Sequence, residues 1–219
     1  MRADSCSDPK PSCHLSFVAM LSRFLLLTLL AYLPSCAFVD REIQLRYPVP
    51  SSLVDTTALE GVAVYLGEFQ DLRQEPARLG PVRNGLGMKT ADVVVAEYSM
   101  PPEDWLQAAV KVELQRRGAH VFDPEDGVQT PADAVVLAGQ LLEVSVDMYI
   151  DYDSKVAFQL QLKQQDHVLL DRRYSGKGGE MAWTTSENEY MEALNQAMHQ
   201  ALLSASVDWK EQLQSGVRP

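Results

Sequence analysis

Apolar and polar residues alternate along the middle of the chain between Ala134 and Tyr174, which predicts strands with one buried face. Leu142, Val144 and Val146, for example, alternate with polar side chains. Strands joined by short turns pair in antiparallel fashion. The pattern predicts strands over 134–150, 156–162 and 168–174, with turns at 151–154 and 165–166.

Two other segments have the 3.6-residue period of amphipathic helices. Pro101 and Pro102 open the first helix, which runs to Arg117 with acidic residues in its first turn and a glycine after its last. Thr185 or Ser186 caps the second helix, which we expect to end near Ala205. Each helix has a single apolar face, so both need a sheet to cover.

Apolar runs in the rest of the sequence predict two shorter strands, over 61–69 and 120–122. A Gly- and Pro-rich stretch that begins at Asp71 predicts a long loop between the first strand and the first helix. The predicted order is strand, helix, four strands, helix. This order predicts an α+β two-layer sandwich, a mostly antiparallel sheet of about four to six strands covered by two helices.

An export signal precedes this body. Arg23 is followed by ten apolar residues, 24–33, which are too few to span a bilayer and are typical of the h-region of a signal peptide. They end in Leu33-Pro34-Ser35-Cys36, which resembles the lipobox of bacterial lipoproteins. The resemblance implies cleavage between Ser35 and Cys36 and lipidation of Cys36. An ordinary secretory signal and an uncleaved anchor are the alternatives.

These features divide the chain into four expected parts. We expect a lipoprotein signal peptide at 1–35, a lipidated N-terminus and tether at 36–58, a single α+β periplasmic domain at 59–205 and a C-terminal tail at 206–219. The residues before Met20 are too polar for a signal peptide, so Met20 is the expected start. Pro48 and Pro50 support the tether, although the alternation of residues 43, 45 and 47 allows a short strand.

Charge and cysteine positions exclude several functions. The chain has 19 basic and 30 acidic residues and a net charge of −11, so it lacks the basic surplus that nucleic-acid binding requires. An acidic surface is repelled by anionic head groups, so we expect the lipid to supply the membrane affinity. Cys6, Cys13 and Cys36 are the three cysteines, and the body after them has no cysteine chemistry.

Familiar catalytic and metal motifs are incomplete. Residues 85–90 lack the Gly directly before Lys of a phosphate-binding loop, and the acidic residues at 147–153 lack the Gly and Glu of a calcium loop. The four histidines, at positions 14, 120, 167 and 199, have no partner at metal-ligand spacing. We therefore predict no catalytic residue, no metal site and no cofactor.

Two tryptophans are candidates for contact with a partner. Residues 176–183 hold three glycines and Trp183, which predicts a mobile connection with an exposed aromatic side chain. Trp209 lies in the expected tail. Packing within the fold is the alternative for both.

The chain resembles the YajG-type family of uncharacterised bacterial outer-membrane lipoproteins over nearly all of residues 36–208. The resemblance rests on the lipobox and on the segments 61–64, 71–73, 82–85, 117–119, 139–141 and 186–188. It implies a domain anchored in the outer membrane of a Gram-negative bacterium and facing the periplasm, and it implies no reaction. Ala37 after the cysteine, in place of the Asp that retains lipoproteins in the inner membrane, agrees with this location.

We therefore expect a non-enzymatic lipid-anchored envelope protein, an accessory or binding partner in envelope biogenesis. The membrane would be one partner, through Cys36, and an envelope protein the other. The alternatives are the auxiliary lipoprotein of a lipid or solvent ABC transporter, a peptidoglycan-synthase activator and a hydrolase with an unconventional site. Strand edges and an apolar helix face leave homo-oligomerisation open.

Overall fold

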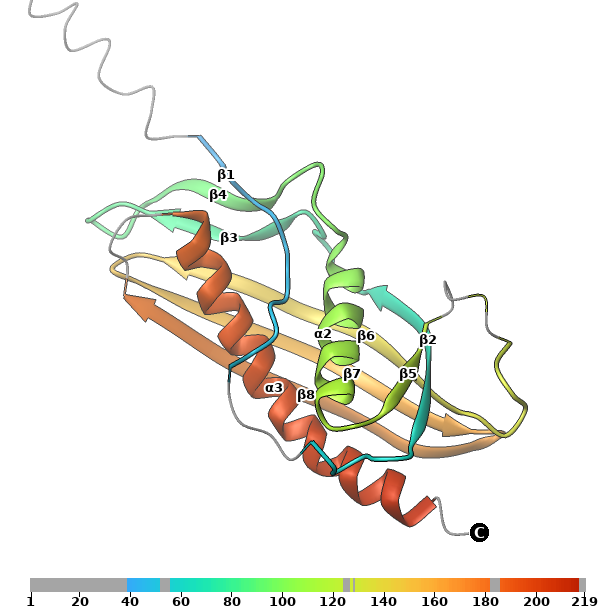
Figure 1. Ribbon diagram of the computed structural model, residues 1–219. Coiled ribbons are helices and arrows are strands. Elements are labelled where there is room, and N and C mark those ends of the chain that lie inside the picture. The colour runs from blue at the N-terminus through green and yellow to red at the C-terminus, as the bar shows by residue number, and fades with distance from the viewer. Residues whose placement is uncertain (1–38, 52–55, 124–126, 128, 182–185, 217–219) are drawn as a thin grey trace, which may run out of the picture. The chain divides into compact units, whose positions relative to one another are not determined.

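One mixed sheet of eight strands organises the part of the chain that the computed structural model describes, residues 39–51, 56–123, 127, 129–181 and 186–216 (Figure 1). The strands are β1 (Arg41–Ile43), β2 (Ala63–Asp71), β3 (Arg78–Arg83), β4 (Lys89–Val95), β5 (His120–Phe122), β6 (Val135–Met148), β7 (Asp151–Gln164) and β8 (His167–Met181).

The sheet is built on β6, a strand of 14 residues. One edge of β6 pairs antiparallel with β7, which pairs antiparallel with β8. The other edge is shared: its first half pairs parallel with β2 as far as Leu141, and Met148 pairs with Val82 of β3. A bulge between Leu141 and Glu143 lies where β2 diverges.

The α+β class is confirmed, but the expected mostly antiparallel sheet of four to six strands was wrong. Strand β5 pairs parallel with β2, and β1 pairs parallel with β4. Strands β3 and β4 form an antiparallel hairpin within the segment that was expected to be a loop. The predicted hairpins β6–β7 and β7–β8 therefore account for three of the eight strands of the described sheet.

The two helices α2 (Pro102–Arg116) and α3 (Glu187–Gly216) cover the same face of the sheet (Figure 1). The bounds of α2 confirm the prediction to within one residue. Helix α3 continues eleven residues beyond Ala205, so the expected tail is largely helical. Trp209 and Leu213 are buried and extend the apolar face of α3, which explains the longer helix. Neither helix is long and apolar enough to cross a membrane, within the described residues.

The turn between β6 and β7 lies at Tyr149–Ile150, ahead of the expected turn at 151–154. Tyr152 and Ser154 are completely buried, so the inward alternation of β7 already begins in the acidic segment that resembled a turn. The second expected turn is confirmed at 165–166, where Gln165 has a positive φ of 54°.

The glycines expected in a mobile connection belong to β8 instead. A Cβ atom on Gly176 would lie 2.0 Å from the backbone oxygen of Ala197, and one on Gly178 would lie 2.0 Å from that of Ala193. The glycines therefore let α3 lie directly on the strand. Ser154 Oγ adds a hydrogen bond of 2.6 Å to the backbone oxygen of Ala193.

Candidate functional site

The structure places only part of the predicted site. Ser35, Cys36 and Trp183 lie outside the described residues. Trp209 is completely buried, so its ring does not face a partner, and the alternative of core packing is what the structure shows. His120 and His167 are exposed on strands, whereas His199 is half-buried on α3. The described residues contain no cluster of His, Cys, Asp and Glu suited to a metal ion.

Residues 40–51, which belong to the expected tether, are bound to the domain. We call residues 40–51 the N-terminal segment. Within it, Ile43 and Leu45 are only 1% and 3% exposed. Two backbone amides hold its first half: the Ala96 amide donates to the Ile43 oxygen at 2.9 Å, and the Leu45 amide donates to Ser99 Oγ at 2.7 Å. Its contacts with the start of α3 include the Gln44 amide, which donates to Glu187 Oε1 at 3.1 Å, and Arg46 Nη2, which donates to Asn188 Oδ1 at 2.6 Å.

The same segment reaches a buried charged cluster, the Glu113 cluster, made of Tyr47, Glu113, Arg116, Arg117 and His199. Glu113 is completely buried on α2. Its Oε2 accepts from Arg117 Nη1 at 2.5 Å, and its Oε1 accepts from Arg116 Nη1 at 2.8 Å. Tyr47 donates its hydroxyl to Oε1 at 3.1 Å, and His199 Nδ1 lies 3.2 Å from the same oxygen.

The electrostatics of the Glu113 cluster favour an ionised carboxylate. Burial by itself raises the pKa of Glu113, but the hydrogen bond and charge of Arg117, with the charges of Arg116 and His199, outweigh burial and hold this pKa below its usual range. Burial and the neighbouring Glu113 carboxylate raise the pKa of Tyr47 well above the usual value for tyrosine. The phenol therefore remains a hydrogen-bond donor at any physiological pH.

The Glu113 cluster acts as a clamp. Both Glu113 oxygens are engaged by neighbouring side chains, and the carboxylate is closed to solvent. It therefore ties the N-terminal segment to α2 and α3 and is not an acid–base pair open to a substrate. Sequence reasoning missed it, because its members come from three distant segments.

A groove follows the clamp along α3. Its volume is about 360 Å³, and it is lined by Tyr47, Pro48, Val49, Pro50, Ser51, Glu192, Asn195, Gln196 and His199. One wall is therefore proline-rich chain and the other is a polar helix face. The two prolines hold the chain extended, so the wall is stiff.

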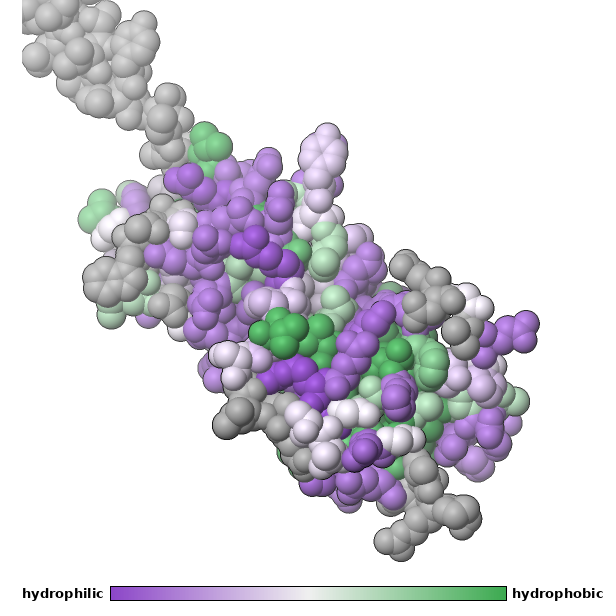
Figure 2. Space-filling model, viewed as in Figure 1, coloured by the Kyte–Doolittle hydropathy of each residue, from purple (hydrophilic) through white to green (hydrophobic). Residues whose placement is uncertain are grey.

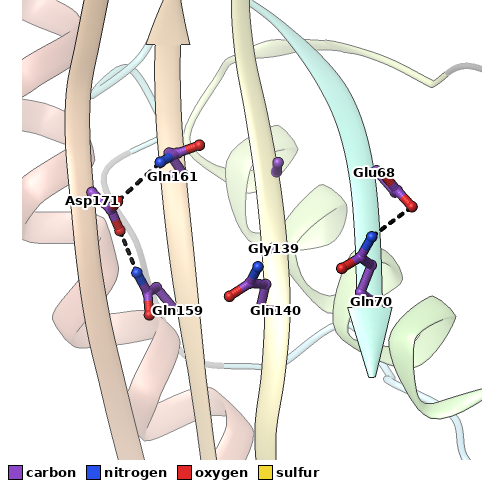
Figure 3. A pocket seen from close by; sticks show the side chains of 8 residues that line it. Glu68, Gln70, Gly139, Gln140, Gln159, Gln161 and Asp171 are labelled. Atoms are coloured by element: carbon purple, nitrogen blue, oxygen red, sulfur yellow. Dashed lines mark hydrogen bonds between the residues drawn. The ribbon is translucent and has the colours of Figure 1, made fainter. Parts of the chain in front are cut away.

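The outer face of the sheet, away from the helices, carries a shallow polar hollow of about 150 Å³ (Figure 3). Figure 3 shows side chains from β2, β6, β7 and β8 in a row. Asp171 accepts hydrogen bonds from Gln159 and Gln161 at 2.5 and 2.9 Å, and Gln70 donates to Glu68 at 2.7 Å. These amides and carboxylates largely satisfy one another, and no basic side chain lines the hollow.

A second hollow of about 540 Å³ lies on β7 and β8, bordered by Lys155, Arg173 and Lys177 together with Glu143. Lys155 and Lys177 are direct cross-strand neighbours. Like charges in such positions repel each other. This is a small basic area on an acidic protein, and Gln200 of α3 also lines it.

Comparisons with known proteins find only distant structural neighbours. No family model matches the sequence, and no curated protein is significantly similar to it. Solved structures with a related fold include protein XCC0632 from Xanthomonas campestris, of family DUF330, which is 16% identical with a TM-score of 0.48 over 81% of this chain and 99% of its own.

Two further neighbours are named as lipoproteins. Lipoprotein GNA1162 from Neisseria meningitidis is 15% identical with a TM-score of 0.33, over 67% of this chain and 96% of its own. A minor lipoprotein from Acinetobacter baumannii is 14% identical with a TM-score of 0.34, over 65% and 98%. Since every TM-score here is below 0.5, these neighbours carry no argument about function, and membership of the YajG-type family stays a prediction.

Proposed function

We propose that this protein is a non-enzymatic lipoprotein of the bacterial envelope, held at the periplasmic face of the outer membrane by lipid on Cys36. The observation that carries the proposal is the apolar stretch ending in Leu33-Pro34-Ser35-Cys36 directly before a folded domain. Two or three acyl chains at one residue hold a protein stably on a membrane, whereas one chain gives marginal binding.

The bound N-terminal segment shortens the link between lipid and domain. Only three residues separate Cys36 from Asp40, and β1 begins at Arg41. Fully extended chain advances about 3.3–3.6 Å per residue, so these four steps reach about 14 Å. The expected tether of residues 36–58 would have reached several times further. A short link favours a function close to the membrane surface. It disfavours the alternative of a peptidoglycan-synthase activator, which must reach across the periplasm to its synthase.

The domain serves, in this proposal, as an accessory that docks on another envelope component. The outer sheet face supports this role, because the polar hollow lined by β2, β6, β7 and β8 opens on it away from both helices. The partner is to be found by experiment.

Replacement of the lipidated residue tests the anchor. Cys36→Ala is expected to abolish labelling by radioactive palmitate and to move the protein out of the outer-membrane fraction, whereas the control Ser51→Ala, at an exposed position of the mature chain, keeps both properties. Unchanged membrane fractionation of Cys36→Ala would contradict the anchor.

In-cell crosslinking tests the accessory role. We expect the lipidated protein to be recovered with another envelope protein, identified by mass spectrometry, and the Cys36→Ala form to lose it. Recovery of the protein alone, or hydrolase activity that one acidic substitution abolishes, would refute the accessory role.

A further inference from the structure

Five exposed apolar side chains gather at one end of the sheet. They are Leu86 (81% exposed), Met88 (57%), Tyr149 (43%), Ile150 (70%) and Met181 (59%). Leu86 and Met88 lie at the β3–β4 turn, Tyr149 and Ile150 form the β6–β7 turn, and Met181 ends β8. We call this set the apolar rim.

The three parts of the apolar rim are neighbours in space. The Tyr149 hydroxyl donates to the Gly85 oxygen at 3.2 Å, which joins the β6–β7 turn to the β3–β4 turn. Arg83 and Asp147, just before the two turns, form an ion pair of 2.8 Å. Met181 is the direct partner of Asp151 in the sheet. In Figure 1 both turns and the end of β8 lie together at the left end.

The β3–β4 turn is built to present apolar atoms. Asn84 Oδ1 accepts hydrogen bonds from the amides of both Leu86 and Met88 at 3.0 Å, and the Gly87 amide donates to the Asn84 oxygen at 2.8 Å. The segment 84–88 has no charged residue. The amides of Leu86, Gly87 and Met88 are satisfied within the turn, which lowers the cost of moving the turn from water into an apolar environment. Figure 2 shows green, hydrophobic surface at the outermost point of this turn.

The chain reaches β1 from the same end. Because β1 and β4 run parallel, residues before β1 approach from the side on which β4 begins, next to Met88. The carboxylate of Asp40 accepts the Asp92 amide at 2.9 Å and holds this approach against β4. The lipid-bearing residue is thus tied by at most about 14 Å of chain to the end of the domain that carries the apolar rim.

We propose that the apolar rim inserts into the interface of the bilayer that holds the Cys36 lipid. This inference rests on the proposed function, since the lipid brings the rim to the membrane. Contiguous exposed apolar surface marks an interaction site, and aliphatic side chains with a tyrosine suit the boundary between acyl chains and headgroups. Lys89 and Asp151, which follow the rim residues in sequence, then lie at headgroup level. The rim fixes the orientation of the domain and leaves its outer sheet face free for a partner.

Fluorescence quenching by lipid tests the rim directly. The protein is isolated in its lipidated form, which begins at Cys36 and has no other cysteine, and one cysteine is introduced by Leu86→Cys, Ile150→Cys or Val168→Cys. Val168 is the matched control, because it is apolar and 52% exposed but lies beside the β7–β8 turn, at the opposite end of the sheet. Each cysteine carries an environment-sensitive fluorophore, and the vesicles contain phosphatidylethanolamine, phosphatidylglycerol and spin-labelled lipid.

We expect spin-labelled lipid to quench the labels at 86 and 150 at least threefold more than the label at 168. Flotation of the same vesicles reports the anchor separately. Protein that floats through Cys36 but shows equal quenching at all three positions would refute the rim and leave the anchor intact. Labels at 86 and 150 that are shielded from water but not quenched would indicate a protein contact and also refute it. Protein that does not float would refute the anchor, and the rim with it.

Discussion

Replacing Arg117 by methionine tests the Glu113 cluster most sharply. The substitution keeps much of the side-chain volume but removes the charge 2.5 Å from Glu113 Oε2, where the carboxylate is completely buried. Removing one partner of a buried ion pair costs about 3–5 kcal/mol, because the other charge stays buried without its compensation. Arg116 still contacts Oε1 at 2.8 Å, so we expect a cost at the lower end of this range. The free energy of unfolding measured with urea should fall by about 3 kcal/mol.

The dependence on pH follows from the sign of the pKa shift. In the unmodified protein the pKa of Glu113 lies below its ordinary value of 4.5, so its stabilising contribution is present above that value and is lost as pH falls through the folded-state pKa. In Arg117→Met we expect burial to outweigh the remaining charges and to raise the pKa of Glu113. The destabilisation should therefore be largest near pH 7 and shrink as the pH falls from the raised pKa of the variant to the lowered pKa of the unmodified protein.

A matched substitution on the surface controls for the general loss of an arginine. Arg172 is 61% exposed and pairs with Asp208 at 2.7 Å, so Arg172→Met should change stability little. A cost for Arg117→Met no larger than that for Arg172→Met, or a cost that does not depend on pH, would refute the clamp.

Two further substitutions test the packing of α3. Gly178→Ala should destabilise the fold by about 1–3 kcal/mol, because its Cβ would overlap the Ala193 oxygen. The control Gly85→Ala, which has open space around the added Cβ, should not destabilise it. Equal unfolding midpoints for the two variants would contradict the close approach of α3 to β8. Trp209→Ala should lower the free energy of unfolding in urea by about 3–5 kcal/mol, because the side chain is completely buried. If the variant instead kept its stability but lost its crosslinked partner, Trp209 would be a surface contact and the packing described here would be wrong.

The sequence predicted the elements with strong local periodicity. The alternation from Ala134 to Tyr174 predicted β6, β7 and the start of β8, and the prolines at 101 and 102 located the start of α2. These signals depend only on neighbours along the chain, and for that reason they could be read without the fold.

The parallel part of the sheet was missed, because its signals depend on contacts between distant segments. Gly80 suggested a loop, yet it lies within β3, where a Cβ would come within 2.0 Å of the Val146 oxygen of β6. The glycine therefore marks a close approach of two backbones. Nor could spacing reveal that Tyr47, Glu113 and His199 meet, since α2 and α3 come together only in the folded sheet.

The route of the N-terminal segment also has a mechanical consequence. A domain fixed to a membrane at one residue is pulled through that residue whenever its partner moves. Tension directed along β1 would shear its contacts with the parallel strand β4 together rather than open them one by one. Beyond β1 the tension would pass through Tyr47 to Glu113 of α2 and His199 of α3. With the anchor proposed above, such a pull would reach the core of the domain without first unravelling the edge of the sheet.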